Sequence, residues 1–193
     1  MGQLAFFSAE TDEPGVADLA GLLAGPGQSA STKSGTRVSV VVADVWRAQA
    51  IAAEMRATGL DAEVTRSDEG SPLARTASIS GLDDLHRRWF TGAVKTMPAG
   101  WVPTPRALRF WVLAAGREDV RGQYLLGLDP HCPQSHAPLA TALMRAGIAP
   151  TLVGTRSVAP ALRVSGRRRL SRLAEYIGVP PAGAPASEWP GAQ

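Results

Sequence analysis

The chain has 193 residues, which is enough for one domain of ordinary size or two small ones, and 45% of them are hydrophobic, so the chain can bury a core. The formal net charge of +3 is compatible with nucleic acid but does not demand it. The single cysteine, Cys132, excludes an internal disulfide, and neither a leader nor an apolar run of ~18 residues is visible, so we expect a cytoplasmic, membrane-free protein.

The first part of the chain predicts a helix, two pairs of strands and two further helices. We expect an N-terminal arm at residues 1–13, and the pattern then predicts an apolar helix from about Pro14 to Ala24 that ends at Gly25-Pro26-Gly27. The predicted elements that follow are a strand or loop at 28–35, a strand at 37–42, a helix at 45–58 capped by Asp44, strands at 62–65 and 75–79 around a hairpin loop at 67–71, and a helix carrying Leu85, Trp89 and Val94.

The second part repeats this order after a Pro-rich linker at 98–105. It predicts a helix at 106–115, a strand at 123–128, a helix at 138–146, hairpin strands at 150–154 and 161–165, and a last helix at 166–177. Asp129 is expected in the place of Asp44. Residues 179–193 are rich in Pro, Ala and Gly, which indicates a flexible tail.

Two copies of one unit are therefore expected, at 14–97 and 106–178. LAGLLAGPG at 19–27 matches LRFWVLAAG at 108–116, and MRATGLDAEVTR matches MRAGIAPTLVGTR further on. This order, with its first-helix motif, resembles the LAGLIDADG homing endonucleases. The resemblance implies an α+β fold of two pseudo-symmetric αββαββα repeats, with the motif helices packed side by side and two sheets forming a saddle for the DNA major groove.

The motif departs from that family where cleavage needs a carboxylate. The family's nucleases carry an acid at the eighth motif position, which helps to hold a divalent cation. Here that position is Pro26 in the first copy and Ala115 in the second, and neither side chain ligates metal. We therefore expect no enzyme activity, no metal and no cofactor. The DNA-binding WhiA regulators are similar to this family and have also lost these acids, although no helix-turn-helix domain like theirs follows the repeats here.

Basic side chains on the predicted strands and hairpins are the candidates for DNA contact, because arginine binds phosphates and pairs with guanine. We expect them to converge on one concave surface, and they are Lys33, Arg37, Arg66 and Arg75 in the first copy and Arg121, Arg156 and Arg163 in the second. Arg167 and Arg168 add a cluster at a helix start, where positive charge is unfavourable. A solvated sheet face is the alternative interpretation of each residue taken alone.

Other motifs favour structure over chemistry. His131, Cys132 and His136 lack the fourth ligand of a closed zinc site, and no third group orients a cysteine nucleophile. The glycines of 21–27 lack the Lys-Ser/Thr ending of a phosphate loop. The sequence thus predicts a monomeric protein that binds double-stranded DNA without cutting it, as a transcriptional regulator or accessory factor. The alternatives are a protein-interaction or scaffolding module and a structured-RNA binder.

Overall fold

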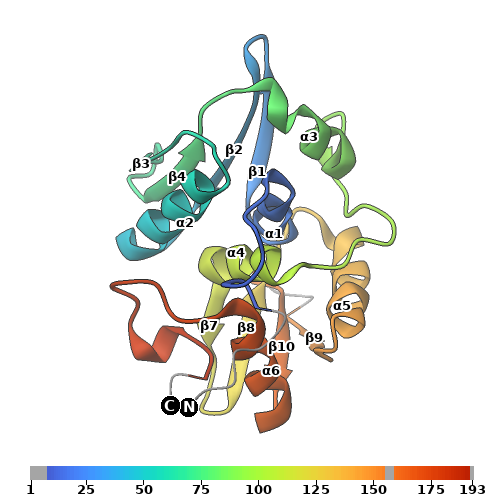
Figure 1. The fold of residues 1–193 in the computed structure, drawn as a ribbon. Coiled ribbons are helices and arrows are strands. Elements are labelled where there is room, and N and C mark those ends of the chain that lie inside the picture. The colour runs from blue at the N-terminus through green and yellow to red at the C-terminus, as the bar shows by residue number, and fades with distance from the viewer. Residues whose placement is uncertain (1–7, 155–158, 192–193) are drawn as a thin grey trace.

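The computed structural model describes residues 8–154 and 159–191, and the chain folds into two halves with the same order of elements (Figure 1). The first half comprises η1 (Val16–Leu19), α1 (Ala20–Ala24), β1 (Gln28–Thr32), β2 (Gly35–Val41), α2 (Val45–Ala57), β3 (Ala62–Arg66), β4 (Pro72–Thr76), η2 (Ser80–Leu82) and α3 (Asp83–Trp89). A short hairpin of β5 (Phe90–Thr91) and β6 (Val94–Lys95) follows it.

The second half repeats the pattern. It comprises α4 (Pro105–Ala115), β7 (Gly116–Glu118), β8 (Gln123–Gly127), η3 (Pro133–Ser135), α5 (His136–Arg145), β9 (Thr151–Val153), β10 (Ala161–Ser165) and α6 (Arg167–Ile177), and it ends with η4 (Ala186–Glu188). Each half is thus αββαββα, as the sequence predicts. No helix among the described residues combines the length and the apolarity that crossing a membrane requires.

Both halves build an antiparallel four-stranded sheet with the same strand order, β1-β2-β4-β3 in one and β7-β8-β10-β9 in the other. The ladders match residue by residue, because Ser39 lies opposite Arg75 in the first sheet and Leu125 lies opposite Arg163 in the second. Helices cover one face of each sheet: α2 packs on β3 and β4, and α6 packs on β10. The internal repeat is therefore an equivalence of register as well as of element order.

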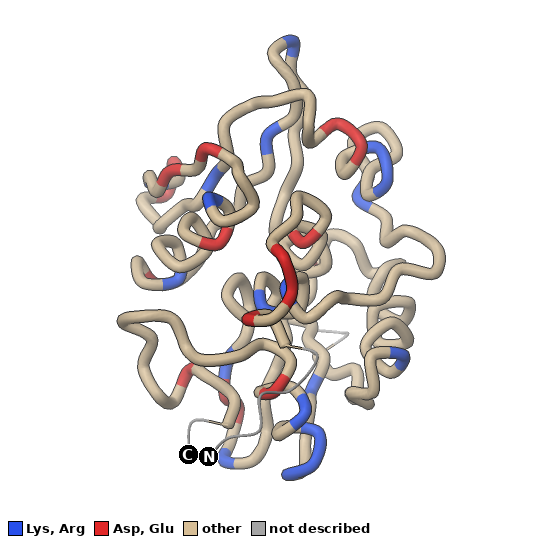
Figure 2. Tube along the Cα trace, viewed as in Figure 1, with Lys and Arg blue, Asp and Glu red and all other residues tan. Residues whose placement is uncertain are grey.

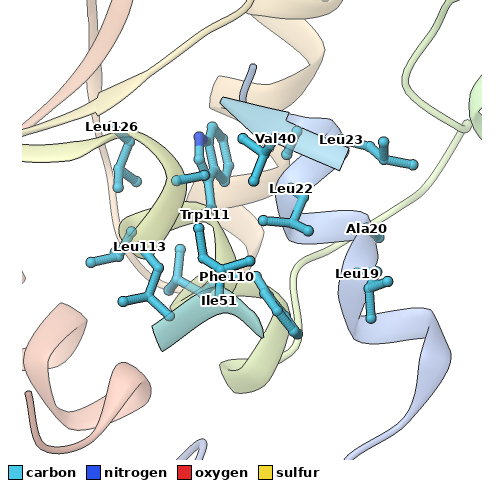
Figure 3. Packing of buried hydrophobic residues seen from close by; sticks show 14 of the residues in the cluster. Leu19, Ala20, Leu22, Leu23, Val40, Ile51, Phe110, Trp111, Leu113 and Leu126 are labelled. Atoms are coloured by element: carbon cyan, nitrogen blue, oxygen red, sulfur yellow. The ribbon is translucent and has the colours of Figure 1, made fainter. Parts of the chain in front are cut away.

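The first helices of the two halves, α1 and α4, pack against each other at the junction (Figure 1). Gly21 permits the contact, because a Cβ atom at this position would lie 1.7 Å from the carbonyl oxygen of Ala107. Leu22 of α1, Val40 of β2 and Trp111 of α4 lie together in the buried cluster that surrounds this junction (Figure 3). The small residues of the first motif thus allow the close approach of helices that the resemblance implies.

One hydrophobic core serves both halves. The same cluster contains Val38 of the first sheet, Leu126 and Leu162 of the second sheet, and the buried faces of α1 and α4. The α4 helix begins with Thr104 as its cap, whose side-chain oxygen accepts a hydrogen bond from the Ala107 N–H. Since the two halves share buried side chains, they are a single folding unit built from a repeat.

Several local predictions were wrong at the ends of elements. Val94 lies in β6 and is exposed, because α3 already ends at Trp89. The return strand of the first half, predicted at 75–79, spans 72–76, and the short strand β7 was not predicted at all. Asp44 is at the N-cap of α2, but its side chain makes no capping hydrogen bond and lies 3.7 Å from Arg47 Nε.

The C-terminal segment is packed as far as it is described, which corrects the prediction of a flexible tail. Trp189 is buried, and its indole N–H donates to the carbonyl oxygen of Gly178. Arg109 lies over the ring of Trp189, and the Tyr124 hydroxyl donates to the carbonyl oxygen of Glu188. The composition of this segment did not predict the packing, because a single tryptophan is enough to anchor a segment that otherwise has few apolar residues.

Candidate nucleic-acid interface

The first sheet has an open face on the side away from its helices. Side chains alternate along β2, so that Thr36, Val38 and Val40 are buried while Arg37 and Val41 point to the other side. Cross-strand partners share a face, which places Arg75 of β4 on the open face through its pairing with Ser39. Arg75 Nε is 2.7 Å from the Glu63 carboxylate, and Arg37 Nε has no hydrogen-bond partner among the described residues.

The second sheet has a corresponding open face, on the side away from its helices, with two arginines, although Leu125 and Ala161 on this face are buried. Arg163 of β10 and Arg117 of β7 both lie opposite Leu125 of β8, so the two guanidinium groups flank one leucine. Arg163 donates to the Gln123 side chain at 3.2 Å, and Arg117 is exposed. Sequence reasoning missed Arg117 because it left β7 unpredicted. Its position directly after the second motif was the available signal.

Four arginines and one acid, Glu63, are thus the charged residues on the open faces of the described strands. Arg75 and Arg163 occupy equivalent ladder positions, as the sequence alignment of the two copies suggested. An excess of positive charge over a pair of pleated faces fits a polyanion. The four residues are Arg37, Arg75, Arg117 and Arg163.

The structure does not bring all of the described basic candidates onto these faces, so the expectation that they all converge was wrong. Arg66 lies opposite Pro72, which by alternation puts it on the helix side of the first sheet, where it donates to the carbonyl oxygen of Gly70. Lys33 and Arg121 are exposed in the β1–β2 and β7–β8 hairpin turns. Arg156 lies outside the described residues.

Arg167 and Arg168 are exposed in the first turn of α6, and Figure 2 shows basic residues gathered along this helix. A pocket of about 680 Å³ lies between α6, the β7–β8 hairpin and the C-terminal segment, and both Arg121 and Arg167 line it. Glu118 and Glu175 line the same pocket. Arg121 and Arg167 therefore lie on the helix side of the second half, in a pocket that Glu118 and Glu175 also line.

The C-terminal ends of α1 and α4 meet at a pocket of about 410 Å³. Pro26 and Ala115, which stand at the acid positions of the LAGLIDADG motif, both line it. Its other lining residues include Asp44, Arg47, Arg117 and Glu188. The two motif ends therefore converge as the resemblance implies, but they bring a proline and an alanine to the place where nucleases hold a metal ion.

A buried arginine occupies the end of α4. Arg47 extends from α2 and is 5% exposed. Its guanidinium donates to the carbonyl oxygens of Val112, Leu113 and Gly116 at 3.1, 3.0 and 2.6 Å, and it pairs with Glu188 at 2.6 Å. The positive charge complements the negative end of the helix dipole, and the guanidinium donates to carbonyls of the last turn, of which Val112 O also accepts the Gly116 N–H.

A buried lysine occupies the end of α1 in the same manner. Lys95 Nζ donates to the carbonyl oxygens of Gly25 and Gly27 at 2.9 and 2.8 Å, and it is 2.7 Å from the Asp129 carboxylate. Burial raises the pKa of Asp129, but hydrogen bonds from Lys95 and His131 outweigh burial and leave that pKa below its usual value. Each central helix thus ends on a fixed cation.

Asp129 also contacts His131 and His136 and adds to the effect of burial on the pKa of the neighbouring Cys132 thiol. His136 Nε2 contacts the Asp129 carbonyl oxygen, while His131 is exposed beside the Asp129 carboxylate. Burial, together with the charge of Asp129, raises the pKa of the Cys132 thiol. The described residues contain no group of three or more His, Cys, Asp or Glu side chains that could hold a metal ion.

Two αββαββα halves with one strand order, joined through their first helices, define the LAGLIDADG fold. Solved structures of that fold are similar to this chain. The homing endonuclease I-WcaI, bound to its DNA recognition sequence, superposes with a TM-score of 0.61 at 11% identity, over 83% of this chain and 79% of that one. The N-terminal LAGLIDADG domain of DUF199/WhiA gives a TM-score of 0.58 at 14% identity, covering 86% and 82%.

Full-length DUF199/WhiA from Thermatoga maritima superposes with a TM-score of 0.60 at 14% identity. The superposition covers 85% of this chain but only 55% of that protein, so this chain spans about half of its length. No protein-family model matches the sequence, and no curated protein matches it. At identities this low, the likeness establishes the fold alone.

Proposed function

We propose that this chain binds double-stranded DNA without cleaving it, as a regulatory or accessory DNA-binding protein. The observation that carries the proposal is the charge of the two open sheet faces. Their charged residues in the described strands are four arginines, Arg37, Arg75, Arg117 and Arg163, and one acid, Glu63. The fold adds support, because I-WcaI has this architecture and its structure holds its DNA recognition sequence.

The ends of the central helices support the non-catalytic part of the proposal. A divalent cation needs oxygen ligands with negative charge, and its approach is opposed by positive charge already in place. Arg47 and Lys95 occupy the carbonyl oxygens at the two helix ends, and Pro26 and Ala115 bring no carboxylate. The carboxylates nearest to these cations, Glu188 and Asp129, are already paired with them.

The test is a fluorescence-anisotropy titration of the full chain with mixed-sequence duplex DNA and with single-stranded RNA, at low salt and near physiological salt. Magnesium is present, and the DNA is examined afterwards for nicks. We expect duplex binding that weakens steeply with salt and leaves the DNA intact, because phosphate contacts release counterions. Nicking would contradict the non-catalytic part, and preference for RNA would favour the RNA-binding alternative.

Variants connect the binding to the open faces. Replacing Arg117 and Arg163 together by alanine should weaken duplex binding about tenfold or more and reduce the salt dependence by about one counterion per lost phosphate contact. The matched control is Arg88→Ala together with Arg145→Ala, which also removes two exposed arginines, one from the end of α3 and one from the end of α5. Equal losses in both proteins would show that binding is non-specific attraction to the whole chain and would refute the assigned face.

A further inference from the structure

The open face of the first sheet carries an apolar row that the charge pattern does not explain. Val41 of β2 is 47% exposed and lies directly opposite Leu73 of β4, and Leu73 lies opposite Thr65 of β3. Because cross-strand partners point to the same side, the three side chains form a line of methyl groups across three adjacent strands. The next row on this face carries Ser39, Arg75 and Glu63.

The second sheet lacks this row. The ladder equivalents of Val41, Leu73 and Thr65 are Gly127, Ala161 and Val153, and the first two are buried. The second sheet instead brings Arg117 to the position that the neutral Gln28 occupies in the first. The two halves are thus alike in backbone register but present different chemistry on their open faces.

Charge and size together indicate what this row contacts. The open faces are positively charged, which favours a DNA duplex as the partner. The row has only three side chains, whereas each side of a standard protein interface has ~20–30 residues, so the row by itself is too small for a protein partner. In the major groove the apolar group on the base edges is the C5 methyl of thymine, and apolar side chains pair with it.

We infer that Val41, Leu73 and Thr65 pack against thymine methyl groups in the major groove of one half of the DNA target. The other half is read through Arg117 and Arg163, which suit guanine and phosphate. The target is therefore asymmetric although the fold is pseudo-symmetric. The inference rests on the proposed duplex binding and names the bases that the first half recognises.

The experiment begins with selection of a preferred target from a randomised duplex pool by the full chain. That target is then resynthesised with deoxyuridine in place of every thymine, which removes the methyl groups and leaves all base-pair hydrogen bonds intact. We expect the affinity to fall about three- to tenfold, the size of one or two lost methyl contacts. Replacing the cytosines of this deoxyuridine target by 5-methylcytosine should not restore the affinity, because the methyl groups then stand on other base pairs.

Two variants assign the effect to the row. The Val41→Ser protein should show a smaller difference in affinity between the thymine and deoxyuridine targets than the unaltered protein does. Val64→Ser is the matched control, since Val64 lies on β3 of the same sheet and is 38% exposed, but it pairs with Ala74 and faces the helix side. The control should keep the full discrimination between the two targets.

The outcomes separate the inference from the proposed function. Salt-sensitive duplex binding with equal affinity for both targets overturns the methyl contact and leaves DNA binding in place. Discrimination that survives unchanged in Val41→Ser overturns the assignment to this row. Failure to enrich any target, or to bind duplex at low salt, overturns the proposed function and the inference with it.

Discussion

The sharpest test of the fold is to add one methyl group at Gly21, where α1 crosses α4. The Cβ of Gly21→Ala would lie 1.7 Å from the Ala107 carbonyl oxygen, half the 3.4 Å at which ordinary van der Waals contact begins. It would also lie 2.6 Å from the Ala107 carbonyl carbon. Both atoms belong to the backbone of α4, so no side-chain rotation relieves the clash, and the helices must move apart.

The cost follows from this geometry. Overpacking a core costs about 1–3 kcal/mol where side chains can adjust, and a backbone clash belongs at the upper end or above it. Separating the helices also loosens the packing between Leu22 and Trp111 (Figure 3). Alanine recovers about 1 kcal/mol through its higher helix propensity. We therefore expect a net loss of at least about 2 kcal/mol in the free energy of unfolding, which corresponds to about 4–8 °C or more in Tm for a chain of this length.

Thermal and urea unfolding of the two proteins provide the measurement. Gly81→Ala is the matched control, because a Cβ at Gly81 meets only the flexible end of Ile79 at 3.4 Å. We expect its Tm to stay within about 2 °C of the unaltered protein. A Gly21→Ala protein that melts together with this control would refute the close helix crossing and the central arrangement built on it.

Three further predictions concern the buried groups at the junction. Arg47→Met should lower the free energy of unfolding by about 3–5 kcal/mol in urea denaturation, because the end of α4 loses its donors and Glu188 loses its partner; a loss below about 1 kcal/mol would contradict the contacts. The lowered pKa of Asp129 means that its ion pair with Lys95 stabilises the fold above the unfolded pKa near ~3.9 and loses this effect as pH falls through the folded pKa. The urea midpoint should therefore drop below about pH 4, and Asp129→Asn should flatten that drop; parallel profiles would refute the pairing. Cys132 is 6% exposed with a raised thiol pKa, so it should react slowly with a thiol reagent at pH 8 in the native protein and rapidly in urea, whereas fast native reaction would show an open site.

Most of the architecture could be predicted from the chain because it depends on local signals. Gly25-Pro26-Gly27 predicted the end of the first helix, and α1 does end at Ala24. The β-branched run at 37–42 predicted the strand that the structure shows as β2. The repeated fragments then predicted the same order of elements in both halves, whereas the strand order within each sheet came from the structure. The replacement of the motif acids by Pro26 and Ala115 could also be predicted, because it requires only an alignment of each copy with the LAGLIDADG motif.

The candidate interface was harder to predict, because the face of a strand residue depends on register. A shift of one residue moves every side chain to the other side of the sheet. Arg66 was misplaced for this reason, since its pairing with Pro72 puts it on the helix side of the sheet, where it is exposed. Arg117 was missed because β7 is only three residues long and carries little apolar pattern.

The sequence by itself thus determined the repeated αββαββα order, since this order follows from residue spacing along one chain. The resemblance to the LAGLIDADG motif added the meeting of the two motif helices and the loss of the acids. Tertiary structure alone decided that Arg47 and Lys95 close the helix ends and that Trp189 anchors the C-terminal segment. These contacts join residues far apart in the sequence, and a buried cation or a packed tail is defined by neighbours that no local pattern specifies.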